Sequence, residues 1–353
     1  MTKPSLRTLI WTAAARTGGA ICSRASRGRL QILGYHGFSF TDEHRFRGKL
    51  FMTPDALERR LNWLKRNRFA VLELGEAIDR LRSGRLKERE IAITIDDGFR
   101  GVHALAAPLF AAHAMRATVY ITSYYVTHPN PVFRVALQYM AWKSPRDSIE
   151  LDGLMPGLHG TLPLRGRDAE AGLLRLYTRA ETELDEPARV ELASQFGARA
   201  EVDYDELRRS RRLSLMQPDE IRDLARHAID VQLHTHRHRL PTERQEIARE
   251  IADNRAVLEP LSTRPLRHFC YPSGVWHIDH WPGLVDAGIE SATTCMPGLN
   301  SRDEPPLALR RFLDGQDVPD GEFAAEMLAV KDLVRRMRGR SAAATTGPAS
   351  SRD

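Results

Sequence analysis

The stretch "EIAITIDDGFRG", residues 90–101, decides the fold class of this chain. Its first half is apolar and rich in β-branched residues, which is typical of a buried strand. Asp96 and Asp97 end that strand, and Gly98 follows them. Two neighbouring carboxylates repel each other, so a chain that needed only a turn would be better served by one Asp with Gly or Asn. The pair therefore predicts a positively charged partner at the end of the strand.

Strand and helix patterns alternate on both sides of this stretch, which indicates an α/β fold with a largely parallel sheet or barrel. A helix is predicted over residues 52–67, where Thr53 is a candidate N-cap and Pro54 occupies the first turn. The other predicted strands cover residues 30–38, 116–122, 228–233, 266–272 and 290–295.

The expected organisation is a basic N-terminal segment (1–29), a barrel (30–318), a C-terminal helix (319–340) and a disordered tail (341–353). Residues from about 123 to 212 break the strand–helix rhythm. We interpret this region as a large, mostly helical insertion on a loop after a strand, where substrate-specific elements are usually carried. Its aromatic residues favour a core for the insertion over a sugar-stacking surface; they are Tyr124, Tyr125, Phe133, Tyr139 and Trp142.

Composition favours a globular protein in a reducing compartment. Of the 353 residues, 42% are hydrophobic, and the three cysteines are too few and too scattered for a disulfide framework. The formal net charge of +6 is concentrated at the two ends of the chain, which leaves a peripheral contact with an anionic membrane open. The apolar run at 9–15 is too short to span a membrane. We expect a cytoplasmic protein, with a cleaved signal peptide as the alternative.

A second polar cluster, "HTHRH" at residues 234–238, also follows an apolar strand. If the two strands are parallel neighbours, both clusters lie at the carboxyl end of the sheet, where active sites are built. Two imidazoles and one carboxylate would form a three-ligand site for zinc or a similar divalent ion, and the second carboxylate would stay free as a base. Spacing leaves the histidine pair open. A strand would align His234, His236 and His238, whereas a helical turn would pair only the first and last.

At these residues the chain resembles the polysaccharide deacetylases of carbohydrate esterase family four, which share a NodB-homology domain. The family's first motif appears as "TIDDG", residues 94–98, and its second as "HTHRH". The resemblance implies a distorted (β/α)7-type barrel in which Asp97, His234 and His238 bind the metal and Asp96 is the catalytic base. His236 would then be a neighbour of the ligands.

The third family motif is represented by "FCYPSG", residues 269–274. Cys270 stands where many members have an arginine that braces the catalytic Asp, and Arg310 or Arg311 is a candidate substitute. The predicted substrate contacts are Tyr271, Ser273, Trp276 and Arg311, with the backbone N–H of Ser273 as a candidate oxyanion donor.

The late Leu-x-His motif, which supplies the general acid in many members, is absent. The branch with a circularly permuted barrel takes this histidine from a Tyr-His pair on an N-terminal strand. Tyr35 and His36 in "GYHGF" match that pair, so the resemblance implies that His36 is the acid.

The predicted activity is metal-dependent removal of an N-acetyl group from a hexosamine of a polysaccharide or lipid-linked glycan, with Zn²⁺ as the expected ion and acetate as a product. An O-deacetylase or a non-sugar amidase would use the same site, and an inactive glycan-binding relative is a further alternative. Nucleic-acid binding is not expected, because the basic ends lack interleaved aromatic residues apart from Trp11.

Overall fold

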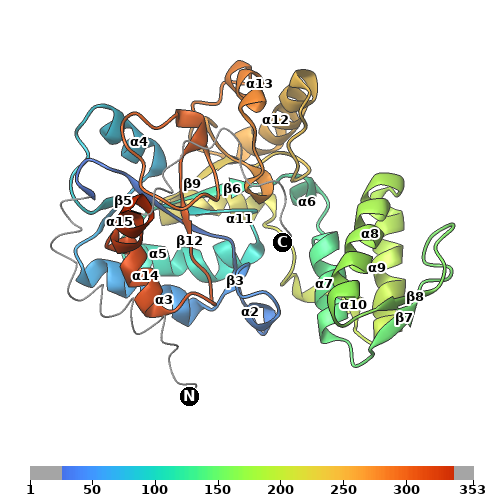
Figure 1. The fold of residues 1–353 in the computed structure, drawn as a ribbon. Helices are drawn as coiled ribbons and strands as arrows, with labels where there is room; N and C mark the ends of the chain where they lie inside the picture. The colour runs from blue at the N-terminus through green and yellow to red at the C-terminus, as the bar shows by residue number, and fades with distance from the viewer. Residues whose placement is uncertain (1–25, 338–353) are drawn as a thin grey trace.

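The computed structural model describes residues 26–337, which form a curled parallel sheet surrounded by helices, with a second helical body beside it (Figure 1). The sheet has eight strands, with the main order β11-β10-β9-β6-β5-β1-β12 and β4 paired to β5. Its strands are β1 (Gln31–Tyr35), β4 (Ala70–Leu72), β5 (Glu90–Ile95), β6 (Ala117–Ile121), β9 (Ile229–Leu233), β10 (His268–Cys270), β11 (Ser291–Thr293) and β12 (Phe312–Leu313).

The sheet curls until its two edges nearly meet. Thr293 at the end of β11 forms a parallel bridge with Leu309, which lies just before β12. Strands β1, β5, β6 and β9 are buried along their whole length, as expected for parallel strands covered on both faces. The predicted distorted barrel is confirmed. The curl of the sheet brings its edge strand β11 close to the opposite edge, at β12.

Helices pack around the barrel and bury their apolar stripes against it. Helix α3 (Pro54–Arg66) begins as predicted, because the Thr53 side chain accepts a hydrogen bond from the backbone N–H of Ala56. Leu57, Leu61 and Leu64 of this helix are fully buried. The other helices around the sheet are α4 (Leu74–Arg82), a π-helical turn (Val102–Ala106), α5 (Ala107–Ala112), α11 (Pro218–Asp223), α12 (Arg244–Leu258) and α13 (Trp281–Asp286).

Between β6 and β9 the chain leaves the sheet and builds a helical body, whose hydrophobic cluster also includes Phe51 and Phe99 of the barrel side. Figure 1 shows it in green, beside the barrel. Its elements are α6 (Tyr124–Thr127), α7 (Phe133–Lys143), β7 (Ser148–Glu150), β8 (Thr161–Pro163), α8 (Arg167–Glu183), α9 (Glu186–Ala200) and α10 (Tyr204–Ser210).

A short helix of the barrel side, α2 (Glu43–Phe46), reaches the helical body. It lies between the two-residue strands β2 (Gly37–Phe38) and β3 (Phe51–Met52), which pair with each other. The Tyr139 hydroxyl of α7 donates to Asp42 at 2.7 Å, and Arg47 donates to Gln138 at 2.9 Å. These contacts attach the helical body to the segment that follows the first strand.

The C-terminal region differs from the single helix expected over 319–340. It forms two helices, α14 (Asp320–Met327) and α15 (Val330–Met337), and Ala329 between them has a left-handed φ of 59°. A residue in that conformation ends a helix, so the chain changes direction at Ala329. The apolar residues keep their helical spacing across this break, which is why the sequence predicted one helix. The expected disordered tail and most of the basic N-terminal segment lie outside the described residues.

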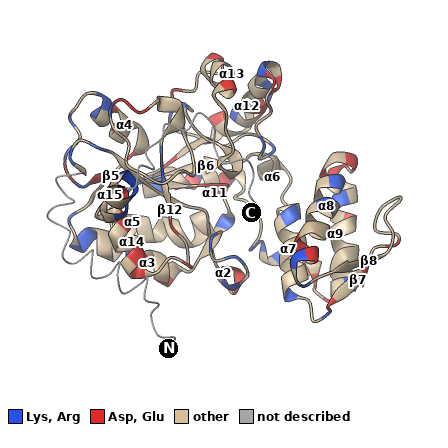
Figure 2. Ribbon diagram, in the orientation of Figure 1, with Lys and Arg blue, Asp and Glu red and all other residues tan. Residues whose placement is uncertain are grey.

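Charges of both signs are interleaved along the helices of the described chain (Figure 2). Within residues 26–337, no helix is both long and apolar enough to cross a membrane.

Candidate active site

The register of the sheet places the predicted polar residues at one end of the barrel. Tyr35 of β1 pairs with Ile95 of β5, so His36 and Asp96 follow at the same level. Ile121 of β6 pairs with Leu233 of β9, so His234 follows there as well. Because all four strands are parallel, the loops after them meet at the carboxyl end of the sheet.

The Asp-Asp-Gly sequence forms a tight turn that separates its two carboxylates. Asp97 adopts a left-handed φ of 68°, which Asp tolerates better than most residues, and Gly98 has φ 86°. The Gly98 N–H donates to the Asp96 carbonyl at 2.8 Å. The turn leaves the Asp96 side chain buried and lets Asp97 face the histidine loop.

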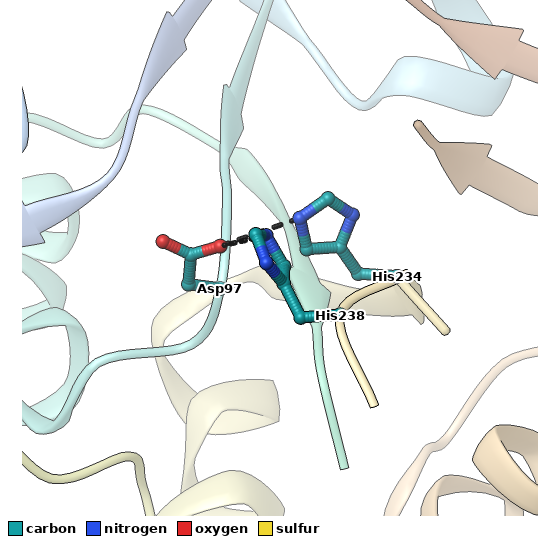
Figure 3. A group of neighbouring side chains, drawn as sticks. All are labelled: Asp97, His234 and His238. Atoms are coloured by element: carbon teal, nitrogen blue, oxygen red, sulfur yellow. Dashed lines mark ion pairs between the residues drawn. The ribbon is translucent and has the colours of Figure 1, made fainter. Parts of the chain in front are cut away.

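Asp97, His234 and His238 converge on one point (Figure 3). Asp97 Oδ1 lies 3.3 Å from His234 Nε2 and 3.2 Å from His238 Nε2, and the three donor atoms all lie within 4.8 Å of one another. Burial disfavours the charge on Asp97, but the hydrogen bonds from His234 and His238 hold its pKa well below the usual range. A carboxylate and two imidazoles with clustered donor atoms fit a divalent cation such as Zn²⁺.

His236 does not join this group. Its Nδ1 lies 2.9 Å from the Ser123 hydroxyl instead. The loop is irregular here, with positive φ at Thr235 (63°) and His238 (55°), so neither a strand nor a helix describes it. The structure therefore selects the pair His234 and His238 through a turn that spacing did not predict.

The His234 ring is held in a defined orientation by buried hydrogen bonds. Its Nδ1 lies 2.8 Å from the Cys270 carbonyl oxygen, which can only accept, so Nδ1 carries a proton and Nε2 faces Asp97. The His234 backbone N–H donates to Asn254 Oδ1 at 3.0 Å, and Asn254 Nδ2 donates to the Ile121 carbonyl at 3.0 Å. Asn254 thus ties the ends of β6 and β9 together behind the site.

Glu250, one helical turn before Asn254 on α12, holds the rest of the histidine loop. One carboxylate oxygen accepts the backbone N–H groups of His236 (3.1 Å) and Arg237 (3.0 Å). The other oxygen accepts from the Arg237 guanidinium at 2.6 Å. Two buried polar residues of one helix therefore fix the loop that carries both histidines.

Arg311 is the positive partner of Asp96, whereas Asp97 faces the two histidines. Arg311 Nη1 donates to Asp96 Oδ1 at 2.7 Å and its Nη2 to Asp96 Oδ2 at 2.8 Å. Both side chains are buried. Burial disfavours the charged carboxylate, but the charge and hydrogen bonds of Arg311 outweigh it and lower the pKa of Asp96. Asp96 is therefore held ionised.

His36 lies on the solvent side of Asp96. Its Nε2 is 3.6 Å from Asp96 Oδ2, and 20% of the side chain is exposed. Within the described residues, its Nδ1 is buried and has no hydrogen-bond partner. One accessible imidazole and one ionised carboxylate thus stand side by side next to the candidate metal ligands.

Comparison with known proteins agrees with this geometry. Residues 193–292 match the model of the polysaccharide deacetylase family, a range that includes His234 and His238. Over that range the chain is similar to polysaccharide deacetylases. No curated protein matches the chain.

Solved structures of low sequence identity share the deacetylase fold. The Streptococcus pyogenes deacetylase PplD in complex with acetate is 13% identical with a TM-score of 0.55, over 85% of this chain and 98% of that chain. IcaB from Ammonifex degensii is 16% identical with a TM-score of 0.52, over 85% and 97%. A de-N-acetylase from Aggregatibacter actinomycetemcomitans is 12% identical with a TM-score of 0.53, over 84% and 99%.

Three of the four predicted substrate contacts have side chains that are buried within the described residues, so these side chains are not open to a substrate in this structure. Arg311 is buried and pairs with Asp96. This placement fits the predicted role as a substitute for the arginine that braces the catalytic Asp in many family members. The Tyr271 hydroxyl donates to the Leu307 carbonyl at 2.9 Å within the core. Trp276 is stacked between Tyr271 and Trp281, each ring centroid 6.0 Å away. Ser273 is exposed, with a left-handed φ of 54°.

Asn254 and Glu250 were not predicted from the sequence. A signal existed, because both fall on the stripe of α12 that also carries the buried residues Ile247, Ile251 and Leu258. Polar residues on an otherwise apolar helical stripe are buried and need partners. The partners themselves, at the ends of two strands, follow only from the packed structure.

Proposed function

We propose that this protein is a metal-dependent N-deacetylase that removes acetyl groups from hexosamine residues of a polysaccharide or lipid-linked glycan. The observation that carries the proposal is the arrangement of an ionised Asp96, an adjacent and accessible His36, and three clustered donor atoms on Asp97, His234 and His238. The likeness of the fold to that of a de-N-acetylase supports the same chemistry.

In this proposal Asp97, His234 and His238 hold the cation. A divalent ion held there would supply a Lewis acid for the acyl oxygen and would lower the pKa of water. Asp96 accepts a proton from the attacking water, since Arg311 keeps its carboxylate ionised and fixed in direction. His36, in its protonated form, donates a proton to the leaving nitrogen. An amine is a poor leaving group without that proton, so turnover of an N-acetyl substrate would require His36 as the general acid.

The backbone N–H of the exposed residue Ser273, in the turn after β10, is the proposed oxyanion donor. An ester substrate would need less help from His36, so an O-deacetylase is the second candidate on the same residues. Residence in the cytoplasm and peripheral membrane contact through the basic ends stay predictions.

The test pairs metal content with acetate release. Purified wild-type, Asp96→Asn and Asp97→Asn proteins are compared on N-acetylglucosamine oligomers and on an acetyl ester, with Asp279→Asn as a control because that side chain is 77% exposed. We expect wild type and Asp279→Asn to bind one divalent ion and release acetate from the oligomers. Asp96→Asn should keep the metal and lose turnover, and Asp97→Asn should lose both.

Acetate from the ester alone would favour the O-deacetylase. Failure of the wild type to bind a divalent ion would overturn the ligand assignment. Unchanged turnover in Asp96→Asn would overturn the base.

A further inference from the structure

One aromatic side chain of the helical body is not part of its core. Phe133 and Tyr139 are buried, and Tyr124 and Tyr125 are partly buried. Trp142 near the end of α7 is 37% exposed, and it is the one aromatic residue among the large exposed hydrophobic side chains of residues 26–337. The prediction that the inserted aromatics form a core therefore fails for Trp142.

Trp142 packs against aromatic residues of both the barrel side and the helical body, where the two meet. Tyr139 packs against it from the preceding turn of α7, with ring centroids 5.6 Å apart and planes at 45°. Phe46 of α2 packs from the barrel side, at 5.8 Å and 48°. Contacts from both bodies hold the indole in place, so its exposed surface is preorganised.

Polar groups border the indole. Asp42 accepts hydrogen bonds from the Tyr139 hydroxyl and from Lys143, and the Lys143 ammonium lies 5.6 Å from the Trp142 ring centroid. Burial disfavours the charge on Asp42, but the hydrogen bonds from Lys143 and Tyr139 lower its pKa, so the carboxylate is held ionised. An exposed indole with a donor over its ring, and an acceptor bonded to that donor, offers both apolar and polar contacts to a pyranose ring.

The position of Trp142 along α7 separates it from the site of reaction. The segment before α7 is joined to the histidine loop, because the Tyr124 N–H donates to the His236 carbonyl at 2.9 Å. At 1.5 Å per residue, Trp142 lies roughly 14 Å along the helix axis from Phe133. The subsite there takes a residue of the glycan other than the one at Asp96 and His36, and the dependence of affinity on oligomer length tests this.

We propose that Trp142, with Asp42 and Lys143, forms a distal subsite that stacks on one sugar ring of a polymeric hexosamine substrate. The inference rests on the proposed function and adds a substrate class to it: an extended chain, in preference to a single sugar. Neither the barrel nor the helical body would form this subsite alone, because Phe46 and Asp42 come from one and Trp142 and Lys143 from the other.

The test measures binding separately from turnover. Full-length Asp96→Asn protein is titrated calorimetrically with β-1,4- and β-1,6-linked N-acetylglucosamine oligomers, from dimer to hexamer, alone and combined with Trp142→Ala, Trp142→Phe or Leu174→Ala. Leu174 is the matched control, because it is a 52% exposed apolar residue of α8 in the same body. Acetate release from the same oligomers is measured with Asp96 intact.

We expect affinity to rise with oligomer length in the parent protein. Trp142→Ala should weaken hexamer binding about two- to tenfold, as for the loss of one aromatic contact, and should weaken dimer binding less. Trp142→Phe should keep most of the affinity, and Leu174→Ala should match the parent.

Equal hexamer affinity in the parent and Trp142→Ala, an equal loss in Leu174→Ala, or no binding of any oligomer would overturn the subsite. Binding that depends on Trp142 without acetate release would refute the proposed function and keep the subsite. Acetate release that does not depend on Trp142 at any oligomer length would support the proposed function and overturn the subsite.

Discussion

Arg311 and Asp96 form a buried, two-pronged ion pair across 215 positions of sequence. Arg311 also donates to the Thr94 hydroxyl at 3.0 Å and to the Thr294 carbonyl at 3.0 Å, so two further hydrogen bonds hold its guanidinium in place. Both Asp96 oxygens are engaged, which fixes the carboxylate plane and keeps Oδ2 beside His36. The pair shows how the barrel keeps the Asp96 carboxyl group ionised although it is buried.

Replacement of Arg311 by Lys should keep a positive charge but lose the two-pronged geometry. We expect acetate release to fall by at least tenfold, because Asp96 is no longer oriented, while metal content stays unchanged. Arg310→Lys is the matched control, since Arg310 pairs with Glu304 outside the site. Equal activity in both variants would mean that the orientation of Asp96 does not depend on Arg311.

Removal of the Asn254 side chain should weaken metal binding. Asn254→Ala leaves the buried His234 N–H and Ile121 carbonyl without partners, and losses of supporting hydrogen bonds typically cost about 10–100-fold in metal affinity. Asn254→Asp keeps the acceptor for His234 and should lose less. Zinc affinity is measured by competition with a chromophoric chelator.

The exposed neighbour on the same helix, Arg249→Ala, is the control for that experiment. If Asn254→Ala binds zinc as tightly as Arg249→Ala, then Asn254 does not position His234.

Replacement of His36 by Ala should separate metal binding from turnover. His36 is not among the clustered donors, so metal content should stay near the wild-type value. Loss of a general acid should lower acetate release from N-acetyl substrates by about 10²–10⁴-fold, with a smaller effect on an acetyl ester. Steady-state rates on both substrates provide the measurement. Equal losses on the amide and the ester would contradict the role as proton donor to nitrogen.

Replacement of Asp230 by Asn should stabilise the fold at neutral pH. Burial raises the pKa of Asp230 to about 6, compared with about 3.9 for an ordinary Asp. The folded state therefore binds more protons between these values, and stability falls as pH rises through this window, by about 3 kcal/mol at most. Asn stays uncharged and can still accept the 2.8 Å hydrogen bond from Gln232.

Urea unfolding at pH 4 and pH 7.5 checks this sign. The gain from Asp230→Asn should be present at pH 7.5 and nearly absent at pH 4, where the folded-state carboxyl is protonated and the unfolded-state carboxyl is about half ionised. Burial lowers the pKa of His268 to about 4 and gives the opposite slope, so only the difference between the two proteins is informative. Asp219→Asn, whose side chain is 97% exposed, should change neither value.

The sequence alone predicted the parts of this protein that depend on local pattern. The Thr53 cap, the buried strands and the expectation that two polar clusters would meet at one end of a parallel barrel all follow from spacing and residue type. The resemblance to a known family then singled out Asp97, His234 and His238, whose donor atoms the structure brings together.

Only the tertiary structure decided which side chains are enclosed and which are free. Arg311, Tyr271 and Trp276 are enclosed by strands and loops distant in sequence, while Trp142 is left at a seam between two bodies. Asn254 matters because two strand ends lie beside its helix. Periodicity and caps are properties of neighbouring residues, whereas burial and hydrogen-bond partners depend on how remote segments pack, and no local pattern encodes that packing.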